Sequence, residues 1–254
     1  MKSYEHVAQP PSGLLLAQGT DDRHMNLAGF FPATSCMGPG RRAILWCQGC
    51  LQRCPGCINP HMQPLRPRTL VAVEDLVAAI DAIEGLEGIT VVGGEPLLQA
   101  AALAALLRCL RGEQGLGTMI YSGYTLAQLI ATHDRNIDAV LRHTDILVDG
   151  PYIAELDQSQ MWRGSANQKI HFLSQRYQNW HRAETCTQRA MELHVDTNGT
   201  FLALGIPSPD FFSRLASQPG VTLEPETEAL FPGSIDASSN AVRCTFKPHT
   251  KDNS

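Results

Sequence analysis

Residues 46–57 read WCQGCLQRCPGC, so four of the chain's eight cysteines fall within one short stretch. The stretch directly follows the apolar run 43–47 (AILWC), which predicts a buried strand. The thiols are therefore expected on a loop at the carboxyl end of that strand. Clustered thiols indicate a metal centre, whereas a disulfide framework is typical of small secreted domains.

Two kinds of metal centre are compatible with these cysteines. A closed structural zinc site needs four ligands, and Cys47, Cys50, Cys54 and Cys57 could nominally supply them. Structural zinc sites usually pair two short knuckles a dozen or more residues apart, whereas these thiols lie in one continuous loop. The spacing C-x3-C-x2-C at Cys50, Cys54 and Cys57 instead supplies three thiolates. A four-iron, four-sulfur cluster bound by three thiolates leaves one iron open for a small-molecule ligand.

The segments after the cysteine loop alternate between helical and strand patterns. Helices are predicted at 73–83, at 97–111 and from Thr125 onward, where Gln128 completes a capping box. Strands are predicted at 89–92, 118–122 and 145–149. This order predicts an α/β fold with a parallel sheet, either open or curled toward a barrel, whose functional edge is formed by the loops after the strands.

A second motif, Gly93-Gly94-Glu95-Pro96, follows the strand that ends at Val92. Glycines let backbone groups approach a ligand closely, and a carboxylate can accept a hydrogen bond from an amine. The plainer interpretation is a strand-to-helix turn in which Pro96 opens the next helix.

Together the two motifs resemble the radical S-adenosylmethionine (SAM) superfamily. Further segments resemble the activating enzymes of anaerobic ribonucleotide reductase over residues 26–176; they are GPGRR (38–42), YSGYT (121–125), LVDGPY (147–152) and WRGSANQ (162–168). The chain departs from that family at Cys36-Met37, at Cys47, which is interpreted as a core residue, and in a long extension beyond Arg176.

The resemblance implies a partial (βα) barrel of parallel strands with flanking helices. It implies one 4Fe-4S cluster, reduced by a flavodoxin- or ferredoxin-like donor, that cleaves SAM into methionine and a 5′-deoxyadenosyl radical. In the activase family that radical abstracts hydrogen from a glycine of a partner protein. The protein's own task is to hold the reactants in place and to exclude water.

The resemblance also assigns roles to individual residues. The cluster ligands and catalytic residues are Cys50, Cys54 and Cys57. The methionine-binding turn is formed by Gly93, Gly94 and Glu95.

Other cofactor contacts are expected at the ends of later strands. Ser122 and Tyr124 are expected to contact ribose or methionine, and Asp149 to face the cofactor or to cap a turn. Arg163 and Asn167 are expected to bind the cofactor carboxylate or a partner, with a solvated surface position as the alternative.

Composition limits the other functional classes. The net charge of -5 provides no basic field for a nucleic-acid backbone. The longest apolar stretches, such as 100–107, are far shorter than the roughly 20 residues needed to span a bilayer. A cytoplasmic protein is expected.

Three regions are predicted along the chain. They are an irregular N-terminal arm (1–25), the partial-barrel domain (26–176) and a C-terminal extension (177–254) with a β-hairpin around DTNG at 196–199. Two other functions remain open: SAM radical chemistry on a peptide or small molecule, and a zinc-stabilised binding module without turnover.

Overall fold

The structure is a computed structural model, and it describes residues 21–112, 115–195, 201–208, 210–218, 221–225 and 242–246. Most of the expected N-terminal arm and the expected turn at 196–199 lie outside these residues. Strand β1 begins at His24, two residues before the expected start of the domain.

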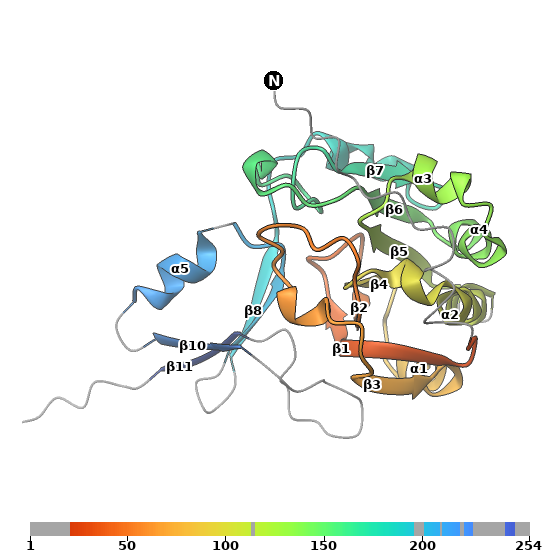
Figure 1. Ribbon diagram of the computed structural model, residues 1–254, viewed down its shortest axis with the longest axis horizontal. Helices are drawn as coiled ribbons and strands as arrows, with labels where there is room; N and C mark the ends of the chain where they lie inside the picture. The colour runs from red at the N-terminus through yellow and green to blue at the C-terminus, as the bar shows by residue number, and fades with distance from the viewer. Residues whose placement is uncertain are drawn as a thin grey trace, which may run out of the picture.

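A mixed seven-stranded sheet forms the centre of the molecule (Figure 1). Its order is β3-β1-β2-β4-β5-β6-β7, and strands β2, β4, β5 and β6 pair in parallel. The bounds are β1 His24–Thr34, β2 Arg42–Cys47, β3 Thr69–Ala72, β4 Gly88–Gly93, β5 Gly117–Ser122, β6 Ile146–Asp149 and β7 Lys169–Phe172.

The parallel arrangement predicted from the β/α alternation is therefore confirmed only for the four central strands. Strands β1, β3 and β7 pair antiparallel with their neighbours, so the sheet as a whole is mixed. Strand β1 contains Gly29 and Pro32, and its pairing with β2 is irregular near both residues. Glycine and proline weaken a strand pattern and are common at bulges, which explains why the sequence did not predict this strand.

Helices cover one face of the sheet. They are α1 Val73–Asp81, α2 Ala100–Gly112, α3 Leu126–Ala131 and α4 Arg135–Arg142, with the short 3-10 segment η2 Pro96–Gln99 leading into α2. The three helices predicted from the sequence are confirmed, and so is the capping box, in which Thr125 and Gln128 exchange hydrogen bonds. The main core lies between these helices and the sheet, and it includes Ala43, Leu45 and Cys47 of β2.

The opposite face of β2 belongs to a second core. Ile44 and Trp46 alternate with the residues of the main core and pack with Leu202 and Leu204 of the C-terminal extension. A strand whose side chains are buried on both faces has a continuous apolar sequence, and residues 43–47 of β2 form such a run. The extension thus covers part of the sheet face that the helices leave free.

The extension contains two small antiparallel sheets (Figure 1). Strands β8 Met191–Val195 and β9 Phe201–Gly205 form one, and β10 Val221–Pro225 and β11 Val242–Phe246 form the other. Helix α5 Phe211–Ala216 lies between them in the chain, and the remaining 3-10 segments are η1 Pro60–Met62, η3 Ala154–Leu156 and η4 Gln178–Glu184. The pairing of β8 with β9 agrees with the strands expected on either side of 196–199, whereas β10, β11 and α5 were not predicted from the sequence.

The GPGRR segment contains Arg42, whose side chain has a structural role at the start of the sheet. This side chain is fully buried, and the guanidinium donates to the carbonyls of Pro39 (3.0 Å), Ile89 (2.5 Å) and Gly117 (3.0 Å) and to Thr90 Oγ1 (2.9 Å). These acceptors belong to the segment before β2 and to the starts of β4 and β5. Arg42 therefore joins the parallel strands at the edge opposite their carboxyl ends.

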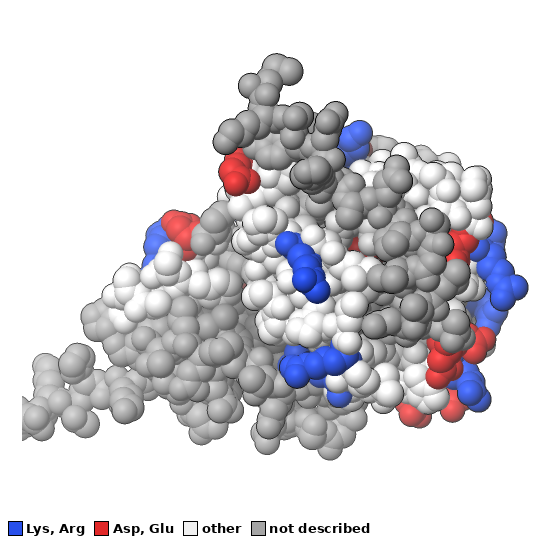
Figure 2. All heavy atoms as spheres, viewed as in Figure 1, with Lys and Arg blue, Asp and Glu red and all other residues white. Residues whose placement is uncertain are grey.

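The surface in Figure 2 carries basic side chains in separate groups, with acidic and neutral residues between them. On the described part of this face the charges form no continuous basic band. None of the helices within the described ranges combines the length and the apolar character that crossing a bilayer requires.

Candidate active site

A cavity of about 410 Å³ opens at the carboxyl ends of the parallel strands. Its wall includes the cysteine loop, the Gly93–Glu95 turn after β4, the end of β5 and Gly150 after β6. Small-molecule sites typically measure about 300–1,000 Å³ and occur at this edge of α/β sheets. The position is the one predicted from the strand order.

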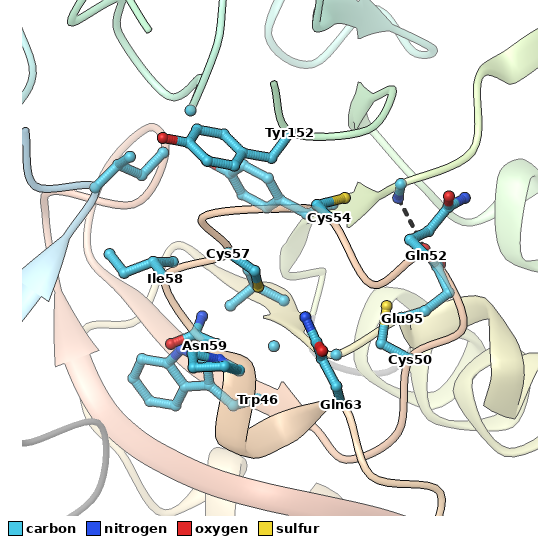
Figure 3. A pocket seen from close by; sticks show the side chains of 18 of the residues that line it. Trp46, Cys50, Gln52, Cys54, Cys57, Ile58, Asn59, Gln63, Glu95 and Tyr152 are labelled. Atoms are coloured by element: carbon cyan, nitrogen blue, oxygen red, sulfur yellow. Dashed lines mark hydrogen bonds between the residues drawn. The ribbon is translucent and has the colours of Figure 1, made fainter. Parts of the chain in front are cut away.

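The three cysteines of the C-x3-C-x2-C motif all line this cavity (Figure 3). Figure 3 shows Cys50, Cys54 and Cys57 around one space, with Glu95 beside Cys50. The start of the loop is held by backbone hydrogen bonds, from Gly49 N to Met62 O (2.7 Å) and from Cys50 N to Gln63 O (3.0 Å). The thiols are thus presented to the cavity by a loop that is secured at its base.

Cys47 lies elsewhere. It is fully buried in the main core, on the helix-covered face of β2, and it does not line the cavity. The prediction that Cys47 is a core residue is confirmed. Within the described ranges, no three His, Cys, Asp or Glu side chains are gathered closely enough to hold a single metal ion. The four-thiolate zinc site weighed from the sequence is therefore not formed by this arrangement.

Burial disfavours the thiolate form of Cys50 and Cys54. It raises the pKa of Cys50 to about 12, with Glu95 adding to the effect, and it raises the pKa of Cys54. A thiol in such surroundings is inert until a cation is bound, because a coordinating metal deprotonates it outright. Cys50 and Cys54 are therefore poorly suited to act as free thiolate nucleophiles.

The Gly93-Gly94 pair allows two loops to pack together. Gly94 N donates to Cys47 O (2.7 Å) and Glu95 N donates to Gly49 O (2.8 Å), so the turn is hydrogen-bonded to the base of the cysteine loop. A Cβ on Gly94 would overlap the Gly49 carbonyl, and Gly93 has a φ of 110°. Glycine is required at these positions by the contact between the loops, whereas the sequence suggested only close approach to a ligand.

Glu95 joins the ends of two strands. Its carboxylate accepts from Ser122 Oγ (3.0 Å), Gly123 N (2.8 Å) and Leu97 N (3.1 Å), and its side chain is buried in the cavity wall. Burial raises the pKa of Glu95 to about 7, although these three donors oppose the shift. Near neutral pH the group is therefore partly protonated, and a cation in the cavity would favour the ionised form.

Two residues expected to contact a cofactor occupy different surroundings. Ser122 lines the cavity and donates to Glu95, while its Oγ also accepts from Tyr124 N (3.1 Å). The ring of Tyr124 is buried in the main core and is not part of the cavity wall.

Asp149, Arg163 and Asn167 hold loops behind the cavity wall. Asp149 accepts from Leu126 N (2.5 Å) at the start of α3, and its Oδ2 lies 2.9 Å from His171 Nε2. Arg163 is buried and donates to backbone carbonyls.

Asn167 donates to Pro151 O (2.7 Å). None of these three residues lines the cavity, whereas their neighbours Gly150, Gly164 and Gln168 do. The structure therefore brings together the cysteines, the glycine turn and Ser122, and it leaves the other predicted residues outside the cavity wall.

Two buried polar atoms at the cavity were not singled out from the sequence. Gln52 Nε2 and Tyr121 Oη make no hydrogen bond among the described residues, and both residues line the cavity. A buried polar group without a partner is costly, so such atoms indicate a ligand or an ordered water. The signal in the sequence was only the position of Gln52 within the cysteine loop and of Tyr121 near the end of the predicted strand 118–122.

The cavity fits a cluster together with a polar small molecule. The donor set consists of three soft thiols in one loop, and Gln52 and Tyr121 offer hydrogen-bonding groups beside them. A four-iron cluster holds its thiolate ligands farther apart than one metal ion does. The open wall of three cysteines is consistent with that arrangement.

Comparison with known proteins gives a consistent result. The family model described as "4Fe-4S single cluster domain" matches residues 36–171. Anaerobic ribonucleoside-triphosphate reductase-activating proteins are similar over about the same length. The Escherichia coli K12 protein is 31% identical over 157 residues, which cover 59% of this chain and 99% of the relative.

The Vibrio cholerae protein of the same name is 35% identical over 156 residues, covering 58% of this chain and 97% of the relative. The enterobacteria phage T4 protein is 27% identical over 154 residues, covering 58% of this chain and 93% of the relative. The relatives are therefore matched almost entirely, while about two fifths of this chain has no counterpart in them.

Proposed function

We propose that this chain, which belongs to the 4Fe-4S single cluster domain family, is a radical SAM activase. The chain also belongs to the family of the anaerobic ribonucleoside-triphosphate reductase-activating proteins. Its task is to cleave SAM reductively and to activate a glycyl-radical enzyme. The observation that supports this proposal best is the convergence of Cys50, Cys54, Cys57 and Glu95 on one cavity.

Cys50, Cys54 and Cys57 hold the cluster in this proposal. When bound, the cluster supplies one electron to SAM, which divides into methionine and a 5′-deoxyadenosyl radical. The chain keeps Cys50 partly buried and places Glu95 next to it. These residues position the ligand and exclude water from the radical step.

The turn after β4 binds the methionine end of SAM. Ionised Glu95 attracts the ammonium group, and the glycines bring this turn against the cysteine loop, so the ligand's amino acid part lies beside the cluster ligands. Gln52 and Tyr121 then provide hydrogen bonds to its polar groups. The sheet acts as a partial barrel whose open mouth is this cavity, and Asp149, Arg163 and Asn167 support its loops.

The protein substrate in this proposal is a glycyl-radical enzyme. The proposal is supported by the names of the relatives, which describe activating proteins of an anaerobic ribonucleoside-triphosphate reductase. A flavodoxin- or ferredoxin-like protein provides the electron. Both partners in this proposal are proteins, and the proposed reaction involves neither nucleic acid nor a membrane.

Anaerobic reconstitution tests the proposed chemistry. The loaded chain, given dithionite and SAM, should release methionine and 5′-deoxyadenosine. Iron and acid-labile sulfide should each approach four per chain, as a single 4Fe-4S cluster requires. A chain with a complete cluster that releases no 5′-deoxyadenosine would contradict the proposal. A chain with one zinc and no sulfide would identify a binding module instead.

The extension supports a second candidate, namely the same chemistry on a different protein or peptide. Residues 203–207 and Phe212 line the cavity although they lie outside the matched region 36–171. Anaerobic copurification separates the two candidates. Capture of a large glycyl-radical subunit supports the first, and capture of an unrelated substrate supports the second.

A further inference from the structure

The C-terminal extension reaches the cavity through one strand. Leu204 at the end of β9 is 1% exposed and packs in the second core with Trp46 and Met37, and all three residues line the cavity. Gly205 has a φ of 111°, and a Cβ there would lie 2.6 Å from Ala190 O. This turn carries the chain from β9 into Ile206 and Pro207, which also line the cavity.

A buried arginine attaches this segment to the rest of the cavity wall. Arg189 forms an ion pair with Asp157 (2.6 Å), and the two side chains are 6% and 5% exposed. Its guanidinium also donates to Pro207 O (3.1 Å), Arg163 O (2.9 Å) and Gly164 O (2.9 Å). One side chain therefore connects the loops after β6 with the end of β9, and three of these partners line the cavity: Asp157, Gly164 and Pro207.

A second connection is made by β8, which closely follows Arg189 in the chain. Glu192 of β8 accepts a hydrogen bond from Ser35 N (2.6 Å), and His194 packs against Phe31 at a ring distance of 5.0 Å. The β8–β9 pair is thus attached on both sides of the second core. Fixed packing of this kind indicates a permanent wall rather than a lid that opens for each substrate.

We propose that residues 203–207 form a built-in specificity wall of the SAM cavity and that Arg189 is its positioning residue. The wall is apolar and encloses the ligand from the sheet face that the helices leave free. The proposal rests on the proposed function only in naming the ligand. It implies that the matched relatives, which are almost wholly aligned with 58–59% of this chain, lack the wall or obtain it from a partner.

The test compares Arg189→Met with Arg214→Met in the full chain, loaded with cluster under anaerobic conditions. Arg214 lies in the same extension and also pairs with an aspartate, but its side chain is 78% exposed. Because Arg189→Met leaves Asp157 buried without its partner, the double variant Arg189→Met/Asp157→Asn is included. It removes both charges and guards against a simple loss of folding.

Two native thiols report on the wall and on the core separately. Cys36 lies in the second core with Leu202 and Leu204, and Cys47 lies in the main core on the other face of the sheet. Both are buried, so pulsed labelling with N-ethylmaleimide, read by mass spectrometry of each peptide, measures how often each core opens. The affinity for S-adenosylhomocysteine, measured by calorimetry, reports on the cavity.

In both Arg189 variants, labelling of Cys36 should accelerate about a hundredfold while labelling of Cys47 stays unchanged. S-adenosylhomocysteine should bind about tenfold more weakly, and Arg214→Met should change neither quantity. The proposal is overturned if Cys36 labelling stays slow, if Cys36 and Cys47 accelerate together in both variants, or if binding is unchanged while Cys36 opens. Failure of the proposed function is distinguishable, since it appears as absence of 5′-deoxyadenosine from the unmodified chain.

Discussion

Serine substitutions at Cys47 and Cys54 should affect different properties: stability at Cys47 and metal content at Cys54. The two residues lie in the same cysteine-rich stretch, but Cys54 lines the cavity and Cys47 is 0% exposed in the main core. If the cluster is bound by Cys50, Cys54 and Cys57 alone, Cys54→Ser should lose metal and Cys47→Ser should lose stability. If the four cysteines formed one zinc site, both variants should lose metal equally.

The expected magnitudes follow from these surroundings. Cys47→Ser places a hydroxyl among aliphatic neighbours such as Leu27 and Leu45, and a buried hydroxyl without a partner costs about 1–3 kcal/mol of unfolding free energy. Cys54→Ser removes one of three thiolate ligands, which should reduce retained iron at least about tenfold. The part-exposed position of Cys54 should leave the stability of the cluster-free chain almost unchanged, within about 0.5 kcal/mol.

Both quantities can be measured on the same preparations. Iron and acid-labile sulfide are determined after anaerobic reconstitution, and urea unfolding of the cluster-free chain gives the stability. The reasoning is refuted if Cys47→Ser loses as much iron as Cys54→Ser, or if Cys54→Ser keeps a full cluster.

Three further substitutions test the architecture around the site. Arg42→Met removes the donor to several buried carbonyls and should lower the free energy of unfolding by about 3 kcal/mol or more. Arg41→Met, at the exposed neighbouring position, should change the free energy of unfolding by no more than about 0.5 kcal/mol. Urea unfolding measures both. Because burial raises the pKa of Glu95 from 4.5 to about 7, the folded chain keeps a proton that the unfolded chain has lost, so stability should fall by up to about 3 kcal/mol as pH rises from about 4.5 to 7. Glu95→Gln should abolish that share of the slope in unfolding curves of the cluster-free chain, and an unchanged slope would disprove the assignment. Gly94→Ala should separate the glycine turn from the cysteine loop and lower both cluster content and SAM affinity, and an alanine variant with normal iron and normal affinity would contradict the packing argument.

The features that the sequence predicted well are local ones. The C-x3-C-x2-C spacing, the apolar run of β2 and the capping box of Thr125 and Gln128 each depend on residues a few positions apart. Such patterns are set by backbone geometry and side-chain chemistry that act over one or two turns, so they can be recognised without knowledge of the fold. The order of β4, α2, β5 and β6 followed from the same patterns.

The roles of single polar residues were less predictable. Asp149 ends a predicted strand, and Arg163 and Asn167 belong to the WRGSANQ segment that resembles the activating enzymes. In the structure these residues instead contact backbone groups and a histidine behind the cavity wall. A carboxylate or guanidinium has the same chemistry in both roles. Only the position of the neighbouring loops decides which partner it meets.

By itself, the sequence determined the cluster-binding chemistry expected at Cys50, Cys54 and Cys57 and the sheet edge at which it occurs. The tertiary structure alone separated Cys47 from those thiols and brought Leu204 and Pro207, which lie more than a hundred residues later in the chain, to the cavity, where Arg189 donates to the Pro207 carbonyl. Side-chain alternation along β2 directs Cys47 to one face and Trp46 to the other, but which segment covers each face depends on long-range packing. That packing is a property of the folded chain, because contacts between distant segments leave no periodic signal in either segment.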